Sequence, residues 1–155
     1  MNIVKIRDVK LGEGCPKICV PITGRTKKEI RLRLEELLAA GADLAEWRAD
    51  WYEEVLHRER LLEMLDFLRQ GLGEIPLLVT FRTREEGGEQ EISRKEYESF
   101  LRQVLSSGNA DLIDVELFRG EELLIGICRE AHRAGVKVVA SSHDFEGTPE
   151  KEEII

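Results

Sequence analysis

The sequence predicts an α/β protein in which a parallel sheet is covered by helices. Short apolar runs alternate with stretches of helical periodicity along the chain. Strict alternation of this kind is typical of parallel strands joined by outer helices. No linker, low-complexity stretch or repeat interrupts the pattern, so residues 1–155 are expected to form a single domain.

The strands are predicted where apolar runs are short and end in polar residues. Their ranges are 17–23, 43–50, 75–83, 111–118 and 136–145. Two architectures fit five such strands, a doubly wound open sheet and a (β/α)₈ barrel. The first strand is not followed by the G-x-G-x-x-G pattern, which disfavours a dinucleotide-binding fold.

Helices are predicted between the strands from their end signals and apolar stripes. Thr26 and Ser93 each precede a glutamate by three residues, the spacing of a capping box. Gly41 and Gly135 stand where glycine commonly ends a helix, and a last helix is expected to start at 148–149 and run to the end. The stripes at helical spacing are Ile30, Leu34, Leu37 and Leu38; Leu61, Leu65 and Leu68; and Tyr97, Leu101, Val104 and Leu105.

Composition argues against several classes of protein. With 42% hydrophobic and 35% charged residues, the chain is expected to be soluble and globular. A net charge of −8 argues against a nucleic-acid partner. No apolar run approaches the roughly 18 residues of a membrane span, and the N-terminus lacks a signal-peptide layout, so we expect a cytoplasmic protein with no membrane partner. The spacing of Cys15, Cys19 and Cys128 favours reduced thiols, two of them packed, over disulfides or a zinc site.

Polar residues gather in the later part of four predicted strands. Residues two apart on a strand share a face, and four such pairs occur: Glu46 with Arg48, Thr80 with Arg82, Asp114 with Glu116, and Ser141 with His143. The carboxyl ends of parallel strands lie together, and barrel enzymes keep their active sites there. An arginine at this rim can bind an anion or a hydroxyl group, and a carboxylate can orient a base.

Each pair also has a structural interpretation. Asp114 and Glu116 could pair with Arg48 and Arg82 in an ion network that only stabilises the fold. The conjunction of four strand ends favours a site over that alternative. Surface positions are expected for four other polar residues, Arg84, Glu85, His57 and His132.

Four stretches carry a resemblance to a known family. They are EWRADWYE (46–53), LLVTFRTREEGGEQ (77–90), LIDVELF (112–118) and VKVVASSHDFEGTP (136–149), and together they resemble type I 3-dehydroquinate dehydratase (type I dehydroquinase). The resemblance covers essentially the whole chain. It implies a (β/α)₈ TIM barrel, of which this chain supplies about the first five βα units, ending at the start of the fifth helix. It also implies dehydration of 3-dehydroquinate in the shikimate pathway, through a lysine imine and without cofactor or metal.

The resemblance assigns roles to individual residues. Glu46, Arg48 and Arg82 would bind substrate hydroxyls. His143 would be the general acid/base that takes the C2 proton and later protonates the departing C1 hydroxyl. Glu86 would orient and polarise that imidazole. Three further carboxylates would support these side chains from behind: Asp50, Asp114 and Glu116.

Two departures from the family pattern follow from the same resemblance. Pro21 stands where the first strand often carries a serine, which would remove one polar contact to substrate. The family's imine-forming lysine and carboxylate-binding arginine belong to strands that come after residue 155. We therefore expect this chain alone to be inactive, and expect its open strand edges to form a homodimer or strand-exchanged oligomer.

Two other hypotheses remain open. The chain could be a non-catalytic fragment or pseudoenzyme that oligomerises through an unclosed sheet. It could also belong to a metal-dependent barrel lyase or isomerase. The oxygen and nitrogen ligands for a divalent ion would then be Glu46, Asp114, Glu116 and His143.

Overall fold

The computed structural model describes residues 3–154, and its centre is a five-stranded parallel sheet. The strands of the sheet are β3 (Cys19–Ile22), β4 (Leu44–Arg48), β5 (Leu77–Thr80), β6 (Leu112–Glu116) and β7 (Lys137–Ser141). The helices are α1 (Lys27–Ala40), α2 (Arg58–Leu72), α3 (Arg94–Ser107), α4 (Glu121–Arg133) and α5 (Lys151–Ile154). Short 3₁₀ turns follow three strands: η1 (Ala49–Trp51), η2 (Arg84–Glu86) and η3 (Leu117–Arg119).

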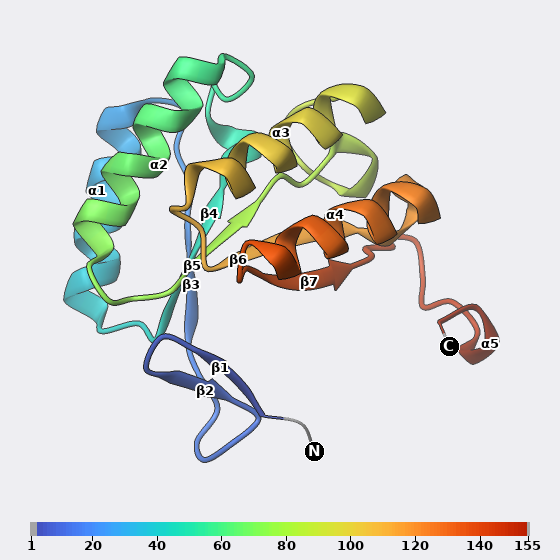
Figure 1. Ribbon diagram of the computed structural model, residues 1–155, viewed down its shortest axis with the longest axis horizontal. Helices are drawn as coiled ribbons and strands as arrows, with labels where there is room; N and C mark the ends of the chain where they lie inside the picture. The colour runs from blue at the N-terminus through green and yellow to red at the C-terminus, as the bar shows by residue number, and fades with distance from the viewer. Residues whose placement is uncertain (1–2, 155) are drawn as a thin grey trace.

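The order of the strands decides between the two predicted architectures. Strands β3 to β7 pair in chain order, and each neighbouring pair is parallel. A doubly wound sheet reverses its order at a switch point, whereas a barrel adds each strand beside the last. Figure 1 shows α1 to α4 as an arc along one side of the sheet. The α/β barrel prediction is confirmed, and the doubly wound alternative is wrong.

The main core lies between the sheet and this arc of helices. The strand residues that face the helices are fully buried, among them Trp47, Val79 and Val115, and so is Phe81 directly after β5. The predicted stripes of α2 and α3 are buried as expected. Leu38 is an exception with 42% exposure. It lies at the margin of the stripe of α1, whose main contacts are with β3 and α2, and this margin is open to solvent.

Helix ends agree with the sequence in part. Ser93 and Glu96 form a complete capping box. At α1, Thr26 accepts from the Glu29 amide, but the Glu29 carboxylate accepts from the Arg25 amide instead of closing the box. Helix α5 begins at Lys151, so the predicted start at 148–149 is wrong, and Ile155 lies outside the described residues.

A hairpin at the amino end of the sheet was not predicted. It consists of β1 (Val4–Ile6) and β2 (Val9–Leu11), which pair antiparallel around a turn in which Arg7 has a positive φ of 51°. Ile6 packs against Leu44 and Leu112 on the face of the sheet that turns away from the helices. The hairpin thus covers the amino end of this inner face (Figure 1). The two-residue alternation of its apolar side chains was the signal available in the sequence.

The cysteines are free thiols, as predicted, but the expected packing of two of them is wrong. Cys15 and Cys19 are exposed and Cys128 is half-buried. Cys19 is exposed because β3 is an edge of the described sheet. Within residues 3–154, no helix is long and apolar enough to cross a membrane.

Candidate active site

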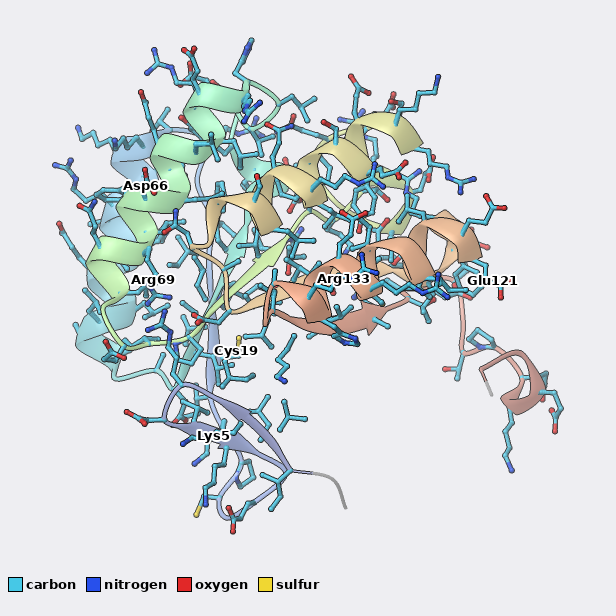
Figure 2. All side chains as sticks on the ribbon, in the orientation of Figure 1. Lys5, Cys19, Asp66, Arg69, Glu121 and Arg133 are labelled. Carbon is cyan, nitrogen blue, oxygen red and sulfur yellow. The ribbon has the colours of Figure 1, made fainter. Side chains whose placement is uncertain are left out.

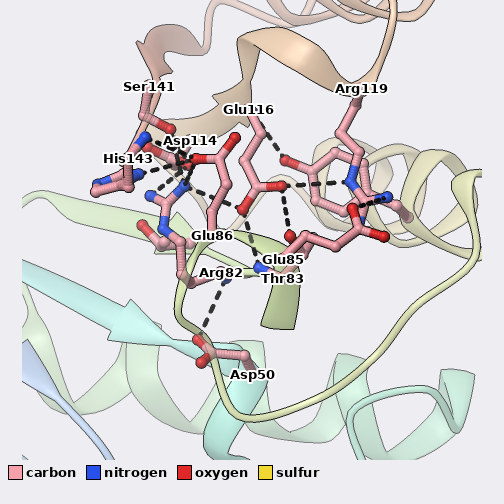
Figure 3. Close-up of polar contacts among 12 residues, drawn as sticks. Asp50, Arg82, Thr83, Glu85, Glu86, Asp114, Glu116, Arg119, Ser141 and His143 are labelled. Atoms are coloured by element: carbon pink, nitrogen blue, oxygen red, sulfur yellow. Dashed lines mark hydrogen bonds and ion pairs between the residues drawn. The ribbon is translucent and has the colours of Figure 1, made fainter. Parts of the chain in front are cut away.

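The carboxyl ends of β4 to β7 bring the predicted polar residues together on the inner face of the sheet. Figure 3 shows most of them in one continuous network of hydrogen bonds and ion pairs. The parallel register sets Arg48 beside Thr80 and Glu116 beside Ser141. The Thr80 hydroxyl also donates to Glu46 across the strands, at 2.7 Å. The prediction that these strand ends meet at one rim is therefore confirmed.

Arg82 is the centre of this network. Its guanidinium is buried, and Nη2 donates to Asp114 Oδ1 at 2.9 Å. The other nitrogen, Nη1, lies 3.1 Å from Glu116 Oε1 and 3.4 Å from Glu86 Oε2, and it donates to the Ser141 hydroxyl at 3.0 Å. One arginine therefore holds three carboxylates that come from two segments, β6 and η2. Such charge-assisted bonds fix geometry more strongly than neutral ones.

Glu116 is a carboxylate that is almost completely enclosed, with 1% exposure. Its Oε1 accepts from the Thr83 amide and its Oε2 from the Thr83 hydroxyl, both at 2.9 Å. Its own backbone amide donates to the hydroxyl of Tyr97 at 3.1 Å. A buried carboxylate needs such donors, because an unpaired buried charge is costly. Glu116 therefore ties β6 to the segment that follows β5.

Asp114 lies beside Glu116 on the same face and is nearly as deep. Burial raises the pKa of its carboxyl, while Arg82 and the hydrogen bond from Ser141 act in the opposite direction. The Ser141 hydroxyl donates to Oδ1 at 2.8 Å. A raised pKa from desolvation marks a carboxylate whose charged form is only partly compensated.

Glu86 and His143 form the exposed edge of the network. Glu86 Oε2 accepts from the His143 amide at 3.1 Å and lies 2.9 Å from the ring Nδ1. Because an ionised carboxylate can only accept, Nδ1 carries the hydrogen and Nε2 of the neutral ring is left with its lone pair. The His143 side chain is 38% exposed and Glu86 only 12%. The histidine is therefore held from behind and opens toward solvent.

Arg48 belongs to a second cluster instead of the network around Arg82. Its guanidinium makes a two-point contact with Asp50, at 2.8 and 2.9 Å. Asp50 is fully buried and also accepts from the backbone amides of Arg82 and Glu89. The predicted ion network of Asp114 and Glu116 thus includes Arg82 but not Arg48. Asp50 links the two clusters through the main chain at Arg82.

An open hollow of about 570 Å³ lies beside His143. Its lining includes three charged residues of the network, Glu86, Glu116 and Arg119, together with Phe118 and Phe145. Both phenylalanines are more than three-quarters exposed, at 79% and 77%. A hollow lined by aromatic side chains together with a few polar groups is typical of sites for small organic molecules.

Sequence reasoning missed three residues of the network, Thr83, Tyr97 and Arg119. Tyr97 was interpreted as part of the α3 stripe, which it also is. Arg119 lies 3.3 Å from Glu116 Oε2 and 2.9 Å from Glu85 Oε2, with its guanidinium over the ring of Tyr97. A position three residues after Glu116 was the only signal for it in the sequence. Such spacing does not distinguish an inward side chain from an outward one in a turn.

The remaining polar residues lie where they were expected. The residues predicted to be at the surface are exposed: Arg84, Glu85, His57 and His132. The four ligands of the metal hypothesis do not converge. In the part of the chain that the structure describes, no group of three or more such side chains is placed to hold a metal ion. Arg82 and its neighbours occupy Asp114 and Glu116 instead.

The arrangement suits proton transfer at a small polar molecule. An exposed imidazole with a free Nε2, held by a largely buried carboxylate, has the geometry of a general base. Arginine and carboxylate groups at the same rim can bind hydroxyl groups of a ligand. The chemistry therefore points to an acid–base reaction of a hydroxylated compound.

Comparison with known proteins gives a consistent result. The family model described as type I 3-dehydroquinase matches residues 18–155. A 3-dehydroquinate dehydratase from Clostridioides difficile is 46% identical over 98% of this chain and 60% of its own length. A relative of the same name from Clostridium botulinum is 49% identical over 99% of this chain and 61% of its own. The chain thus spans about 60% of the length of these relatives.

Solved structures match equally well. A type I 3-dehydroquinate dehydratase from Clostridium difficile, solved with covalently modified comenic acid, superposes with a TM-score of 0.95 at 46% identity. The match covers 99% of this chain and 60% of that one. The 3-dehydroquinate dehydratase from Geobacillus kaustophilus gives a TM-score of 0.93 at 34% identity, with the same coverage.

Proposed function

The chain belongs to the type I 3-dehydroquinase family, and we propose that it supplies the acid–base half of a 3-dehydroquinate dehydratase. In this proposal the complete barrel removes water from 3-dehydroquinate in the shikimate pathway. The described residues provide the general acid/base and much of the hydroxyl-binding surface. The residues that form the imine and bind the substrate carboxylate lie outside the described strands.

One observation carries this proposal: Nδ1 of His143 is held 2.9 Å from Glu86 at the rim of the sheet. The contact occupies Nδ1 and leaves Nε2 available as a base on a residue that lines the open hollow. Such an imidazole can take the C2 proton of the substrate and return it to the departing C1 hydroxyl. Because its unperturbed pKa lies near neutrality, a histidine serves in both directions.

The hydroxyl-binding role falls to Glu46, Arg48 and Arg82. Glu46 and Arg48 are half-buried on β4, and Asp50 holds the guanidinium of Arg48 in a fixed plane. Arg82 is more deeply buried, so its contribution is one of local charge as much as of direct contact. Pro21 lies beside Glu46 in the register of β3 and β4 and offers no side-chain hydrogen bond there.

A C–H bond beside a carbonyl is only weakly acidic, and the imine step overcomes this. An iminium acts as an electron sink and makes that carbon more acidic. The covalent modification in the relative from Clostridium difficile supports covalent chemistry in this family. Among residues 3–154, Lys137 is at the amino end of β7 and Lys151 is on α5, so neither is at the carboxyl end of a strand.

The test is a chimera in which this chain is continued by the remainder of the Clostridioides difficile relative. The chimera should dehydrate 3-dehydroquinate, measured by the absorbance of the conjugated product. His143→Ala should lower kcat by roughly 10²–10⁴-fold, the usual contribution of a general acid/base. Glu86→Gln should cost less, because the amide still orients the ring. His132→Ala, at the far surface of α4, is the matched control.

Two outcomes would overturn the proposal. A folded chimera with no activity would favour the pseudoenzyme hypothesis. A chimera whose rate survives His143→Ala would show that the base lies elsewhere. Borohydride treatment with substrate should leave the mass of the 155-residue chain itself unchanged, and a stable adduct on one of its lysines would contradict the division of roles.

We also propose that the isolated chain forms a dimer or larger oligomer. In the described sheet β3 and β7 are the edges. The face of β7 around Val139 is partly exposed, at 37%. Open strand edges recruit other strands. Light scattering at micromolar concentration should show a mass above 17.7 kDa, and a clean monomer would contradict this.

A further inference from the structure

Arg119 holds the segment that carries Glu86, although it touches neither Glu86 nor His143. It is the last residue of η3, on the turn that follows β6. Its side chain is 13% exposed and is bound to two carboxylates, Glu116 on β6 and Glu85 on η2. The guanidinium carbon lies 5.7 Å from the centre of the Tyr97 ring. A buried arginine with an aromatic neighbour and two anionic partners is held in a single geometry.

The first connection from Arg119 to Glu86 runs through Glu116. Arg119 Nε is 3.3 Å from Glu116 Oε2, the same oxygen that accepts from the Thr83 hydroxyl. The Thr83 carbonyl in turn accepts from the amides of Glu86 and Gly88, at 3.0 and 2.8 Å. Hydrogen bonds to Thr83 therefore hold the η2 turn, and hydrogen bonds to Glu116 hold Thr83.

The second connection runs through Glu85. Arg119 Nη1 lies 2.9 Å from Glu85 Oε2, and Glu85 directly precedes Glu86 on η2. Glu85 is 75% exposed, so this contact alone is weak. Figure 3 shows Arg119 in contact with both Glu116 and Glu85, so one buried connection and one at the surface hold η2.

The charges of the network give Arg119 a second effect. Arg82 faces Asp114, Glu116 and Glu86 as their common cation. Of these three carboxylates, Glu116 is the one that also pairs with Arg119. Without it, Glu116 would draw Arg82 toward itself, and the 3.4 Å contact of Arg82 with Glu86 would be the first to lengthen. The carboxylate of Glu86 would then lose one of its three partners.

We propose that Arg119 is a positioning residue that fixes the Glu86 carboxylate against Nδ1 of His143, acting through Glu85 and Glu116. The inference rests on the proposed acid–base role of His143. It predicts that Arg119 sets the tautomer of the imidazole, because the hydrogen bond to Glu86 is what keeps the hydrogen on Nδ1. A residue that only stabilised the fold would not affect this tautomer.

The experiment measures the tautomer in the chain itself. With ¹⁵N-labelled histidine at pH 8, the nitrogen shifts of His143 should show a ring protonated at Nδ1. In Arg119→Gln the Nδ1–H form should lose its majority, and the protection of the His143 amide from hydrogen exchange should fall roughly 5- to 10-fold, as for the loss of one hydrogen bond. His57 and His132 serve as internal references. Arg119→Lys should restore the signals in part, because a point charge cannot replace the fork of donors.

Two further variants keep the test decisive. Arg102→Gln is the matched control, since Arg102 also pairs with two carboxylates, Glu98 and Glu130, on the outer surface of α3 and α4. It should leave the signals of His143 unchanged. If Arg119→Gln does not fold, Glu85→Gln removes only the exposed connection and should shift the tautomer in the same direction by a smaller amount.

The failure of this inference is distinguishable from that of the proposed function. In the active chimera, Arg119→Gln should lower kcat roughly 10-fold with KM within about twofold, because positioning of the base is lost and binding is not. Unchanged His143 signals in a folded Arg119→Gln variant, or equal changes in Arg102→Gln, would overturn the positioning role. An inactive chimera with the expected tautomer change would refute the function and leave the positioning role intact.

Discussion

The two ends of the inner face of the sheet differ in how arginines and carboxylates are paired. At the amino end, the hairpin covers an apolar layer, and the carboxylate just before β6, Asp111, receives two arginines. Arg7 Nε lies 2.7 Å from its Oδ1 and Arg69 Nη1 lies 2.8 Å from its Oδ2. At the carboxyl end one arginine, Arg82, faces three carboxylates. Figure 2 shows Arg69 at the amino end, close to the turn that follows α2.

The difference is visible in the titrating groups. At the amino end, burial and the neighbouring charge of Arg7 lower the pKa of Arg69. At the carboxyl end, burial raises the pKa of Asp114. At the carboxyl end the buried carboxylates outnumber the arginine that they share, whereas at the amino end two arginines bind the one carboxylate of Asp111. An excess of buried carboxylates costs stability, and such perturbed clusters are more frequent at functional sites than elsewhere.

The largest expected effect comes from removing Arg82, the cation that three carboxylates of the carboxyl end share. Arg82→Met leaves Asp114 and Glu116 buried without it and should lower the free energy of unfolding by about 4 kcal/mol, the usual cost of breaking a buried ion pair from one side. Urea denaturation followed by circular dichroism measures this.

The amino end provides the control for that comparison. Arg69→Met leaves Asp111 with Arg7 as a partner, and its cost should be about 1–2 kcal/mol. If Arg82→Met and Arg69→Met lower the unfolding free energy by the same amount, the different pairing of arginines and carboxylates at the two ends has no effect on stability.

The second prediction concerns the apolar contact between the hairpin and the amino end of the sheet. Ile6 is 4% exposed against Leu44 and Leu112, so Ile6→Ala should cost about 2–4 kcal/mol through lost burial and the cavity left behind. Ile3→Ala, at 52% exposure, should change stability by less than about 0.5 kcal/mol. Equal effects would mean that the hairpin does not seal the amino end.

The same two ends show which parts of the fold could be predicted from the sequence. The strands and the stripes of α2 and α3 could be predicted, because their periodicity is set by burial against one partner layer. The hairpin could not be recognised with the same ease, because each strand has only three residues and Arg7 turns without a glycine. Leu38 shows the converse: a helical stripe predicts a buried face but not how wide its neighbour is.

The site was predicted as a set of strand ends but not as a network. Alternation along each strand was sufficient to place Glu46, Arg82 and Asp114 on one face. It could not show that Arg48 would bind Asp50 instead of the β6 carboxylates, nor that Arg119 would fold back onto Glu116. Both depend on turns after the strands, where the direction of a side chain is not set by a two-residue period.

The third prediction uses the pKa of Asp114. Burial raises the pKa of this carboxyl in the folded state above its ordinary value of 3.8, so the folded state binds its proton more readily than the unfolded state. Stability from this group is therefore gained as pH falls through the raised pKa toward 3.8 and lost as pH rises again. Asp114→Asn keeps an acceptor for Arg82 and Ser141 but removes the titration.

The measurement is the difference in unfolding free energy between Asp114→Asn and the unaltered protein across that range. The variant should gain relative stability as pH rises above 3.8, with a slope of at most about 1.4 kcal/mol per pH unit for one proton. Glu121→Gln, at an exposed position at the start of α4, is the control and should show no such trend. A relative gain on lowering the pH would mean that Arg82 dominates burial at Asp114.

The smallest expected effect on stability comes from breaking an exposed ion pair, and each end of the sheet has one. Glu74 is 84% exposed and lies 3.3 Å from Arg7, while Glu85 is 75% exposed and lies 2.9 Å from Arg119. Glu74→Gln and Glu85→Gln should each change the unfolding free energy by less than about 0.5 kcal/mol, since exposed pairs contribute little and salt screens them.

The consequences of Glu74→Gln and Glu85→Gln for His143 should nevertheless differ. Glu74→Gln removes a contact that ends at the hairpin, so the nitrogen shifts of His143 should not change. Glu85→Gln removes one of the two supports of η2, so the same shifts should move toward a mixture of tautomers. Equal behaviour of the two variants in the histidine spectrum would mean that the ion pairs of the carboxyl end, like those of the amino end, do no more than hold the fold together.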